Sequence, residues 1–445
     1  MNDFEHDLNQ CCQAPHSNRK VAFEALRSVF ERHTKTLEIR GACYSSDQST
    51  PLLDLANNYS NQNRDGVTLL LLLIQQESVP ESAVPTFIRR SQHLLSNIDH
   101  EFTSFASQEL VSFCHGVSRV ACNDRSAGML IRPLQRLCSI ISPSSTCLCS
   151  IHADVLQVCI SSKMYSYALS FVTSHNISEI NPKQYPLSSV DFLRYFYYSG
   201  IIFIAFNRFR EALECFDQVM CTPAQIVSAV AVESIKKATL VSLLEHGTAY
   251  KIPGGESSMF IKNNLIPPPI YTNIAKAFEA NDKERLADVV KEGAADLRKD
   301  SNFGLAKQVV SALTSRRLIN ISRTYATITL EGIARALEIP EDSVEAEVLR
   351  LNRQGQIRAR INPQTSMVEF LEPDTAVSTD VICQLQSALC QSAAATEKLR
   401  DLHANVLTHP LIVSRAVSNS QHAGSVAAAG PGVMMRDDGY AEEYL

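Results

Sequence analysis

Cysteines and histidines are the residues of this chain best suited to binding a metal or acting as nucleophiles. The 445 residues include 13 cysteines and 12 histidines, which are scattered along the sequence. The pairs Cys11–Cys12 and Cys147–Cys149 lack the two-residue gap of a zinc knuckle, and no second pair follows at metal spacing. We therefore interpret the cysteines as small buried residues of a protein in a reducing compartment, and we expect no metal and no other cofactor.

Sequence motifs of catalysis are also missing. The chain has no phosphate-binding loop, no nucleophile elbow, no HExxH and no GxGxxG. It has no His-x-His pair that could hold a metal-bound water. We interpret single histidines such as His115 and His152 as structural residues. The sequence thus predicts a protein that is not an enzyme.

The charge balance argues against nucleic acid and membranes as partners. The chain carries 41 basic and 47 acidic residues, for a net charge of −6, and these are interspersed. Its N-terminus, MNDFEHDLNQ, has no apolar signal segment, and the strongest apolar run, Val67–Ile74, is far too short to span a bilayer. The length favours two or three domains.

Helices are the elements that must position these residues over the first half of the chain. The segment Ala22–Arg32 places its apolar side chains on one helical face, and similar stripes recur through residue 246. Alternating strand patterns are nearly absent there. Breaks are predicted at Ser45–Pro51, Ser139–Ser150 and Gly247–Pro269.

Two segments of this region resemble each other. Leu156–Val172 and Gly200–Phe216 align with an offset of 44 residues, which pairs Ala168 with Ala212. In each segment an apolar helix leads through a short polar turn into a second helix that opens with an aromatic and a small residue. This pattern predicts helical hairpins of the tetratricopeptide type, stacked as a solenoid that contacts other proteins. A coincidental likeness of two amphipathic hairpins stays open as the alternative.

Residues 301–372 change to the order helix, strand, helix, helix, hairpin, which is typical of a winged helix. The second of these helices has Thr329 as a predicted N-cap, and the first ends at a basic turn, Arg316–Arg317. The predicted elements are helices Gly304–Ser315, Leu330–Leu337 and Glu341–Gln354, strand Tyr325–Ile328, and a β-hairpin of Ile357–Ile361 with Met367–Phe370.

A heptad pattern follows after Pro373. Apolar and small residues recur in alternating steps of four and three, with one polar position at Ser392. The members of this seam are Val381, Leu385, Ala388, Ser392, Ala395, Leu399, Leu402 and Val406. We expect the helix to bury this seam against other helices, since alone it would be marginal. Residues 409–445 are predicted to be disordered.

A winged helix raises the alternative of a DNA-binding protein. The predicted recognition helix carries Glu341, Asp342, Glu345 and Glu347 but only two arginines, so its N-terminal end would repel phosphates. Further arginines lie nearby and are interpreted as a solvated face. They are Arg316, Arg317, Arg323, Arg358 and Arg360.

Local motifs connect this architecture to a known family. Residues 295–308 carry the pattern D-x-N-x-G-L-x-x-Q, formed by Asp300, Asn302, Gly304, Leu305 and Gln308. This pattern resembles the PCI-domain family, and within it the subunit 3 family of the COP9 signalosome. The same resemblance extends to Arg323–Tyr325, Thr329–Leu330, Met367–Phe370, Tyr195–Gly200 and Ile151–Asp154. The tail from Ser418 and the Gly254–Gly255 insertion have no counterpart in the resemblance.

The resemblance implies a non-catalytic scaffold subunit of a hetero-oligomer in the cytoplasm and nucleus. Such subunits pair through winged-helix sheet edges and gather their C-terminal helices into a bundle. The complex removes the ubiquitin-like modifier NEDD8 from cullins, and its metal site lies on a different subunit. Expected partners are other PCI and metalloprotease-type signalosome subunits and, indirectly, cullin-RING ligases. A PCI subunit of the proteasome regulatory lid or of the translation initiation factor three complex is the alternative within the same fold.

The resemblance also assigns roles to single residues. Asp300 and Asn302 are expected to cap helices and form turns, and Gly304 to allow close packing. The residues with expected structural or interaction roles are Asp300, Asn302, Gly304, Leu305, Val368, Phe370, Leu385, Leu399 and Leu402.

The overall prediction is a mainly α protein with a solenoid of helical hairpins, a winged-helix (PCI) module and a C-terminal bundle helix. The predicted parts are an N-terminal helical region (1–150), hairpin repeats (151–300), the winged helix (301–372), the heptad helix (373–408) and a disordered tail (409–445).

Overall fold

The computed structural model describes most of the chain. The described residues are 2–13, 19–41, 61–76, 79, 81–122, 124–142, 144, 146–175, 177, 180, 187–224, 226–254, 259–362, 366–371, 379–410 and 413–414. The predicted break at Ser45–Pro51 and most of the predicted disordered tail lie outside these residues. Contacts divide the chain into two units, Met1–Thr324 with Ile333–Pro340, and Tyr325–Gly332 with Glu341–Leu445.

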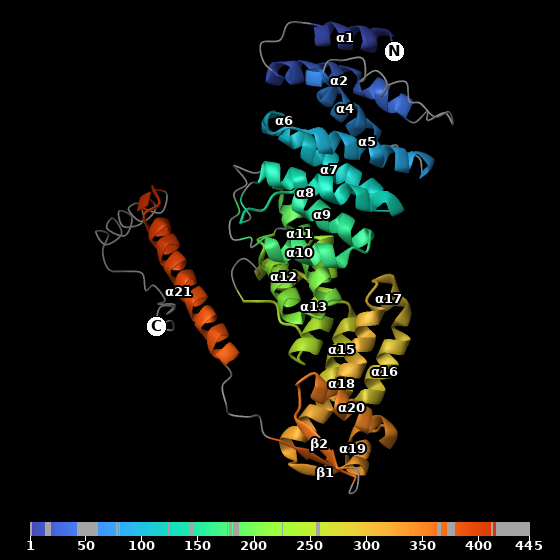
Figure 1. Cartoon of the computed structure of the whole chain (residues 1–445), viewed down its shortest axis with the longest axis vertical. Helices are drawn as coiled ribbons and strands as arrows, with labels where there is room; N and C mark the ends of the chain where they lie inside the picture. Colours follow the sequence, from blue (N-terminus) through green and yellow to red (C-terminus); the bar gives the residue numbers. More distant parts are fainter. Residues whose placement is uncertain are drawn as a thin grey trace, which may run out of the picture. The chain divides into compact units, whose positions relative to one another are not determined.

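Helices make up almost all of the first unit, as the sequence predicts. In Figure 1 they follow one another in chain order, and successive helices contact each other. Those before the first predicted hairpin are α1 (Asn2–Gln13), α2 (Arg19–Gly41), α4 (Asn61–Gln75), η1 (Glu81–Ala83), α5 (Val84–Asn97), α6 (His100–Phe105), α7 (Ser107–Ala121), η2 (Arg125–Leu130) and α8 (Ile131–Ile141).

The helices that follow form the predicted hairpins and continue beyond them. They are α9 (Ile151–Ser161), α10 (Tyr165–Ser174), α11 (Ser189–Ala205), α12 (Phe209–Cys221), α13 (Ala229–Glu245), α14 (Met259–Asn264), α15 (Pro269–Glu279), α16 (Lys283–Glu292), α17 (Ala294–Lys299) and α18 (Phe303–Thr324). The short helix α14 lies inside Gly247–Pro269, which the sequence predicted as a break. None of the described helices is long and apolar enough to cross a membrane.

The likeness of the two hairpins is confirmed at their turns. Lys163 and Asn207, which are 44 residues apart, have φ angles of 57° and 58°. In both turns the next amide donates to a carbonyl five residues earlier, Met164 to Cys159 at 2.9 Å and Arg208 to Phe203 at 2.9 Å. This is the Schellman ending of a helix. The small residues Ala168 and Ala212 are fully buried, as the hairpin interpretation requires.

The same ending recurs further along the chain, where the sequence showed no repeat. Asn281, between α15 and α16, has a φ of 60°, and Ser301, before α18, has a φ of 57°. The following amides, of Asp282 and Asn302, again bond carbonyls five residues earlier. One turn geometry therefore connects at least four helix pairs of this unit.

The second unit contains the three-stranded sheet. Its strands are β1 (Thr327–Thr329), β2 (Ala359–Asn362) and β3 (Met367–Phe370), in the antiparallel order β1-β3-β2. The unit also holds α20 (Glu341–Arg353) and α21 (Thr379–Leu407), and α19 (Leu330–Leu337) runs from this unit into the first. The order α18, β1, α19, α20, β2, β3 is the predicted winged helix.

The predicted second and third helices and the last strand of the winged helix agree with the structure to within one residue, but the first helix and the other two strands differ. Strand β1 covers Thr327–Thr329 instead of Tyr325–Ile328, and β2 covers Ala359–Asn362 instead of Ile357–Ile361. The Thr329 hydroxyl accepts a hydrogen bond from the Gly332 amide at 3.1 Å, which confirms it as a cap of α19. The predicted first helix, Gly304–Ser315, is too short, because α18 continues to Thr324 through Arg316 and Arg317. These arginines are therefore helical residues and not a turn.

Candidate functional site

The turn between α17 and α18 carries the signature residues and is tied to two earlier helices. The Lys236 ammonium on α13 donates to Asp300 Oδ1 at 2.8 Å, and the Tyr271 hydroxyl on α15 donates to Asp300 Oδ2 at 2.7 Å. Asn302 Nδ2 donates to the Tyr271 oxygen at 2.9 Å, and Asn302 Oδ1 accepts from Lys237 at 2.8 Å. One polar network thus connects α13, α15 and the turn.

Burial and charge govern this network. Tyr271 is fully buried and Asn302 is 2 % exposed, so unpaired polar groups would be costly there. Burial tends to raise the pKa of Asp300, but the bonds from Lys236 and Tyr271 outweigh it and hold the pKa below its usual value. Burial lowers the pKa of Lys237. The network is suited to fixing the angle between helices.

Asp300 and Asn302 form bonds to other helices beyond the capping that was predicted for them, whereas Gly304 does not have its predicted role. Asp300 is the C-cap residue of α17 and Asn302 directly precedes α18, but the side-chain bonds described above reach other helices. The expectation for Gly304 is wrong, because a Cβ atom added there would meet no atom within 4 Å. Leu305 packs against two hydrophobic clusters of the first unit, one formed mainly by the earlier helices and one around α15 and α16.

The sheet offers a backbone edge for strand pairing. Strand β3 lies between β1 and β2, and its Val368 (0 % exposed) and Phe370 (9 % exposed) are buried. Val368 and Phe370 therefore have a structural role, and a partner strand can be added only beside β1 or β2.

The register of the β2–β3 pair shows which backbone groups of β2 face away from β3. The Leu371 amide bonds the Arg358 carbonyl at 2.9 Å, so the alternation of an antiparallel pair turns the N–H and C=O of Ala359 and Ile361 away from β3. The Asn352 side chain occupies both groups of Ala359, donating to its carbonyl at 3.2 Å and accepting from its amide at 3.4 Å. The outward backbone groups of Ile361 are then the ones that β2 presents for pairing.

Helix α21 presents the predicted seam to solvent. The described side chains from Leu385 to Leu407 are all exposed. The exposed large apolar residues of the seam are Leu385 at 59 %, Leu399 at 66 %, Leu402 at 59 % and Val406 at 51 %. Leu389, at 61 %, widens the apolar surface. Such a surface on a helix of 29 residues is typical of a helix that is completed by partner helices.

The arginines that raised the DNA alternative are largely occupied. Arg316 donates to the carbonyl of His246, the C-cap residue of α13, at 2.5 Å. Arg317 donates to the carbonyl of Asn281 just after α15. Positive charge at a helix C-terminus is favourable, so both arginines stabilise the solenoid. On α20, Arg350 forms an ion pair with Glu347 at 2.5 Å.

A buried ion network in the first unit was not predicted. His115 on α7 lies between two carboxylates, with its Nδ1 2.7 Å from Asp154 on α9 and its Nε2 3.4 Å from Asp191 on α11. Arg194 bonds both carboxylates at 3.3 Å. The sequence contained no signal for this network, because its members come from three helices.

The charges of this network are mutually dependent. Burial lowers the pKa of His115, but its bonds to Asp154 and Asp191 outweigh burial and raise the pKa to about 9. Burial raises the pKa of the fully buried Asp154 above its usual value. Both ring nitrogens of His115 face carboxylates, which suits a doubly protonated imidazolium. The group borders a pocket of about 930 Å³.

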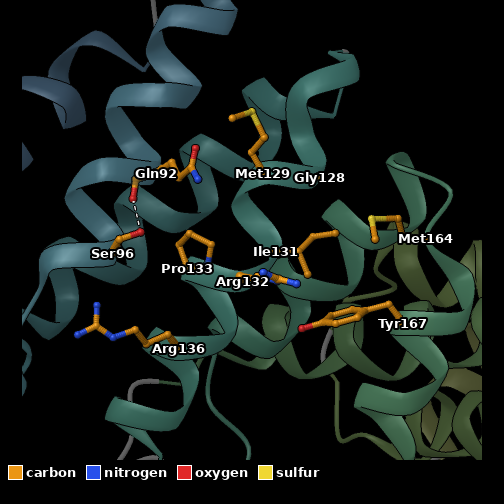
Figure 2. Close-up of a pocket in the computed structure, with 10 residues that line it drawn as sticks. All are labelled: Gln92, Ser96, Gly128, Met129, Ile131, Arg132, Pro133, Arg136, Met164 and Tyr167. Carbon is orange, nitrogen blue, oxygen red and sulfur yellow. Dashed lines mark hydrogen bonds between the residues drawn. The ribbon is translucent and has the colours of Figure 1, made fainter.

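A second pocket, of about 460 Å³, lies among α5, η2, α8 and α10 (Figure 2). Met129 and Met164, each 43 % exposed, provide apolar surface, and Arg132 and Arg136 provide positive charge. The described residues that line it include no histidine, cysteine or carboxylate, so they offer no acid–base pair or nucleophilic thiol. Its chemistry fits contact with another protein better than catalysis.

Comparisons with known proteins agree with this picture. A family model described as COP9 signalosome complex subunit 3, N-terminal helical repeats, matches residues 45–260, and a PCI domain model matches residues 294–372. A protein named COP9 signalosome complex subunit 3 from Dictyostelium discoideum is 36 % identical over 228 residues, which are 51 % of this chain and 54 % of that protein. The match therefore spans about half of that relative.

A relative of the same name from Arabidopsis thaliana matches over a longer stretch. It is 31 % identical over 320 residues, which are 70 % of this chain and 71 % of that protein. The resemblance that the motifs suggested is thereby confirmed.

Proposed function

Because this chain belongs to the COP9 signalosome complex subunit 3 family, we propose that it is a non-catalytic scaffold subunit of a signalosome that removes NEDD8 from cullins. Its direct partners would be PCI and metalloprotease-type subunits, and cullin-RING ligases would be reached through them. We expect this assembly in the cytoplasm and nucleus. A sister PCI complex, the proteasome lid or translation initiation factor three, is the alternative.

The observation that carries this proposal is the exposed seam of α21. Leu385, Leu399 and Leu402 are more than half exposed, and a helix with such a surface gains stability by packing against other helices. Burying one leucine contributes roughly 1.5–3 kcal/mol. A bundle of C-terminal helices from several subunits would bury the whole seam.

The edge of the winged-helix sheet supports a second contact. Strand β2 turns the backbone groups of Ile361 outward, and addition of a strand from another subunit would complete them. The signature network at Asp300 and Asn302 would hold α18, the first helix of the winged helix, at a fixed angle to α13 and α15. Neither contact requires a catalytic group.

Disrupting the seam tests the proposal. The double variant Leu385→Asp with Leu399→Asp places two charges on the apolar surface, so we expect the tagged chain to lose its partner subunits in affinity purification and sedimentation. Circular dichroism should show that the solenoid stays folded.

A matched control places the same charges elsewhere on α21. Gln386→Asp with Ala393→Asp adds two negative charges at exposed positions outside the seam, and this variant should retain its partners. Unchanged recovery of partners by the leucine variant would refute the bundle. Mass spectrometry of the wild-type purification identifies the complex: proteasome ATPases or ribosomal small subunits in place of signalosome subunits would move the chain to a sister assembly.

A further inference from the structure

Three potential metal ligands meet in the core of the first unit. Cys138 lies on α8, Cys149 lies two residues before the start of α9, and His152 lies in the first turn of α9. Their exposures are 2 %, 1 % and 1 %, and their ligand atoms all lie within 4.8 Å of one another. The spacing along the sequence does not indicate this cluster, because Cys138 is separated from Cys149 by a helix end and a loop.

The spacing of the donor atoms suits a tetrahedral metal ion. Cys149 Sγ lies 3.0 Å from His152 Nδ1. With Zn–S of about 2.3 Å and Zn–N of about 2.0 Å, tetrahedral angles place a sulfur and a nitrogen about 3.5 Å apart and two sulfurs about 3.8 Å apart. Shifts of less than about an ångström would therefore bring all three donors to bonding distance.

The charges of the three donors suit a buried zinc ion. Two thiolates and a neutral imidazole would make a zinc complex with no net charge. A neutral complex is the form that costs least to bury.

The three donors come from two neighbouring helices. Cys138 lies on α8, and Cys149 and His152 lie just before and at the start of α9, so one ion would join these two helices of the solenoid. Structural zinc sites are built from sulfur and nitrogen ligands of this kind.

We propose that Cys138, Cys149 and His152 bind one structural Zn²⁺ ion. Binding replaces the thiol protons of the two cysteines by sulfur–zinc bonds and releases those protons to solvent, without any change of oxidation state. The ion stabilises the packing of α8 against α9. This site is independent of the interfaces proposed above.

Metal analysis of the purified full-length chain tests the site. We expect elemental mass spectrometry to find about one zinc ion per chain. Replacement of the zinc by Co²⁺ should produce the intense absorption band of sulfur-to-cobalt charge transfer. Cys149→Ser and Cys138→Ser should lose the metal. Cys159→Ser is the matched control: Cys159 is fully buried on α9, its pKa is raised by burial alone, and the variant should keep the zinc.

A measurement on the wild-type chain covers the case in which the serine variants fail to fold. A chelator should release the zinc and lower the melting temperature, and added Zn²⁺ should restore it. Less than about 0.1 zinc per chain, with no cobalt spectrum, would overturn the proposal. An intact mass 2 Da lower, from a Cys138–Cys149 disulfide, would overturn it equally.

Discussion

At the scale of single residues, His115 shows how this solenoid uses charge inside its core. Its ring lies between Asp154 and Asp191, and Arg194 bonds the same two carboxylates. A buried carboxylate without a positive partner is costly, so the removal of one member penalises those that remain. The network therefore contributes most to the packing of α7, α9 and α11 while His115 is protonated.

The pKa of His115 leads to a prediction about pH. A histidine whose pKa is raised on folding contributes stability that is fully present below its unfolded pKa, about 6.5, and is lost as pH rises through about 9. The ring's side chain is 30 % exposed, so we expect a contribution of about 1–2 kcal/mol. Between pH 6 and 9.5 the unfolding free energy of the wild type should fall by about this amount relative to His115→Gln.

Chemical denaturation at several pH values measures this difference. His93→Gln, at an exposed histidine, is the control and should show the wild-type pH dependence. Parallel curves for the wild type and His115→Gln would contradict the assignment.

The candidate site could be predicted from sequence only in part. The signature predicted that Asp300 and Asn302 form the turn before the winged helix, but their partners Lys236 and Lys237 lie 64 and 65 residues earlier. Tertiary partners at such separations leave no local pattern. Gly304 was misjudged for the same reason, since open space beside a residue is a tertiary property.

At the scale of elements, the repeated helix ending defines the solenoid. Lys163 and Asn207 hold the left-handed conformation at equivalent places in successive hairpins. The patterns of large and small residues predicted these hairpins, and the structure adds the later turns at Asn281 and Ser301. The sequence did not show the full length of α18, because two adjacent arginines resembled a turn, and only the folded chain provides the carbonyl groups that they bond.

Relieving one left-handed residue should stabilise the chain. The left-handed conformation costs an ordinary residue about 1–2 kcal/mol, and glycine escapes this cost but gains freedom in the unfolded chain. We therefore expect Lys163→Gly to raise the unfolding free energy by about 0.5–1 kcal/mol, measured by denaturant titration. The opposite sign is expected for Glu214→Gly, an exposed position inside α12, which should lose about 1 kcal/mol. Destabilisation by both changes would show that the turn is not strained.

At the scale of the whole molecule, charge separates a scaffold from a DNA reader. The net charge of the chain is −6. Arg316 and Arg317 donate to backbone carbonyls, and Arg350 forms an ion pair with Glu347. Binding to DNA draws most of its affinity from cations that contact phosphates. The net charge and these contacts favour contact with proteins over DNA binding.

A titration with duplex DNA checks this statement. We expect no binding below about 10 μM in fluorescence anisotropy at about 150 mM salt, where even non-specific DNA-binding proteins bind measurably. A winged-helix protein of known DNA affinity serves as the positive control. Micromolar or tighter binding that weakens steeply with salt would contradict the scaffold assignment.

The Asn352 side chain has a consequence for the chain before it meets any partner. An open sheet edge is a template on which further copies can add strands and grow into aggregates. Asn352 covers the outward groups of Ala359, so the edge of β2 offers the outward groups of Ile361 alone. A stretch this short gives little hold for uncontrolled strand addition along β2.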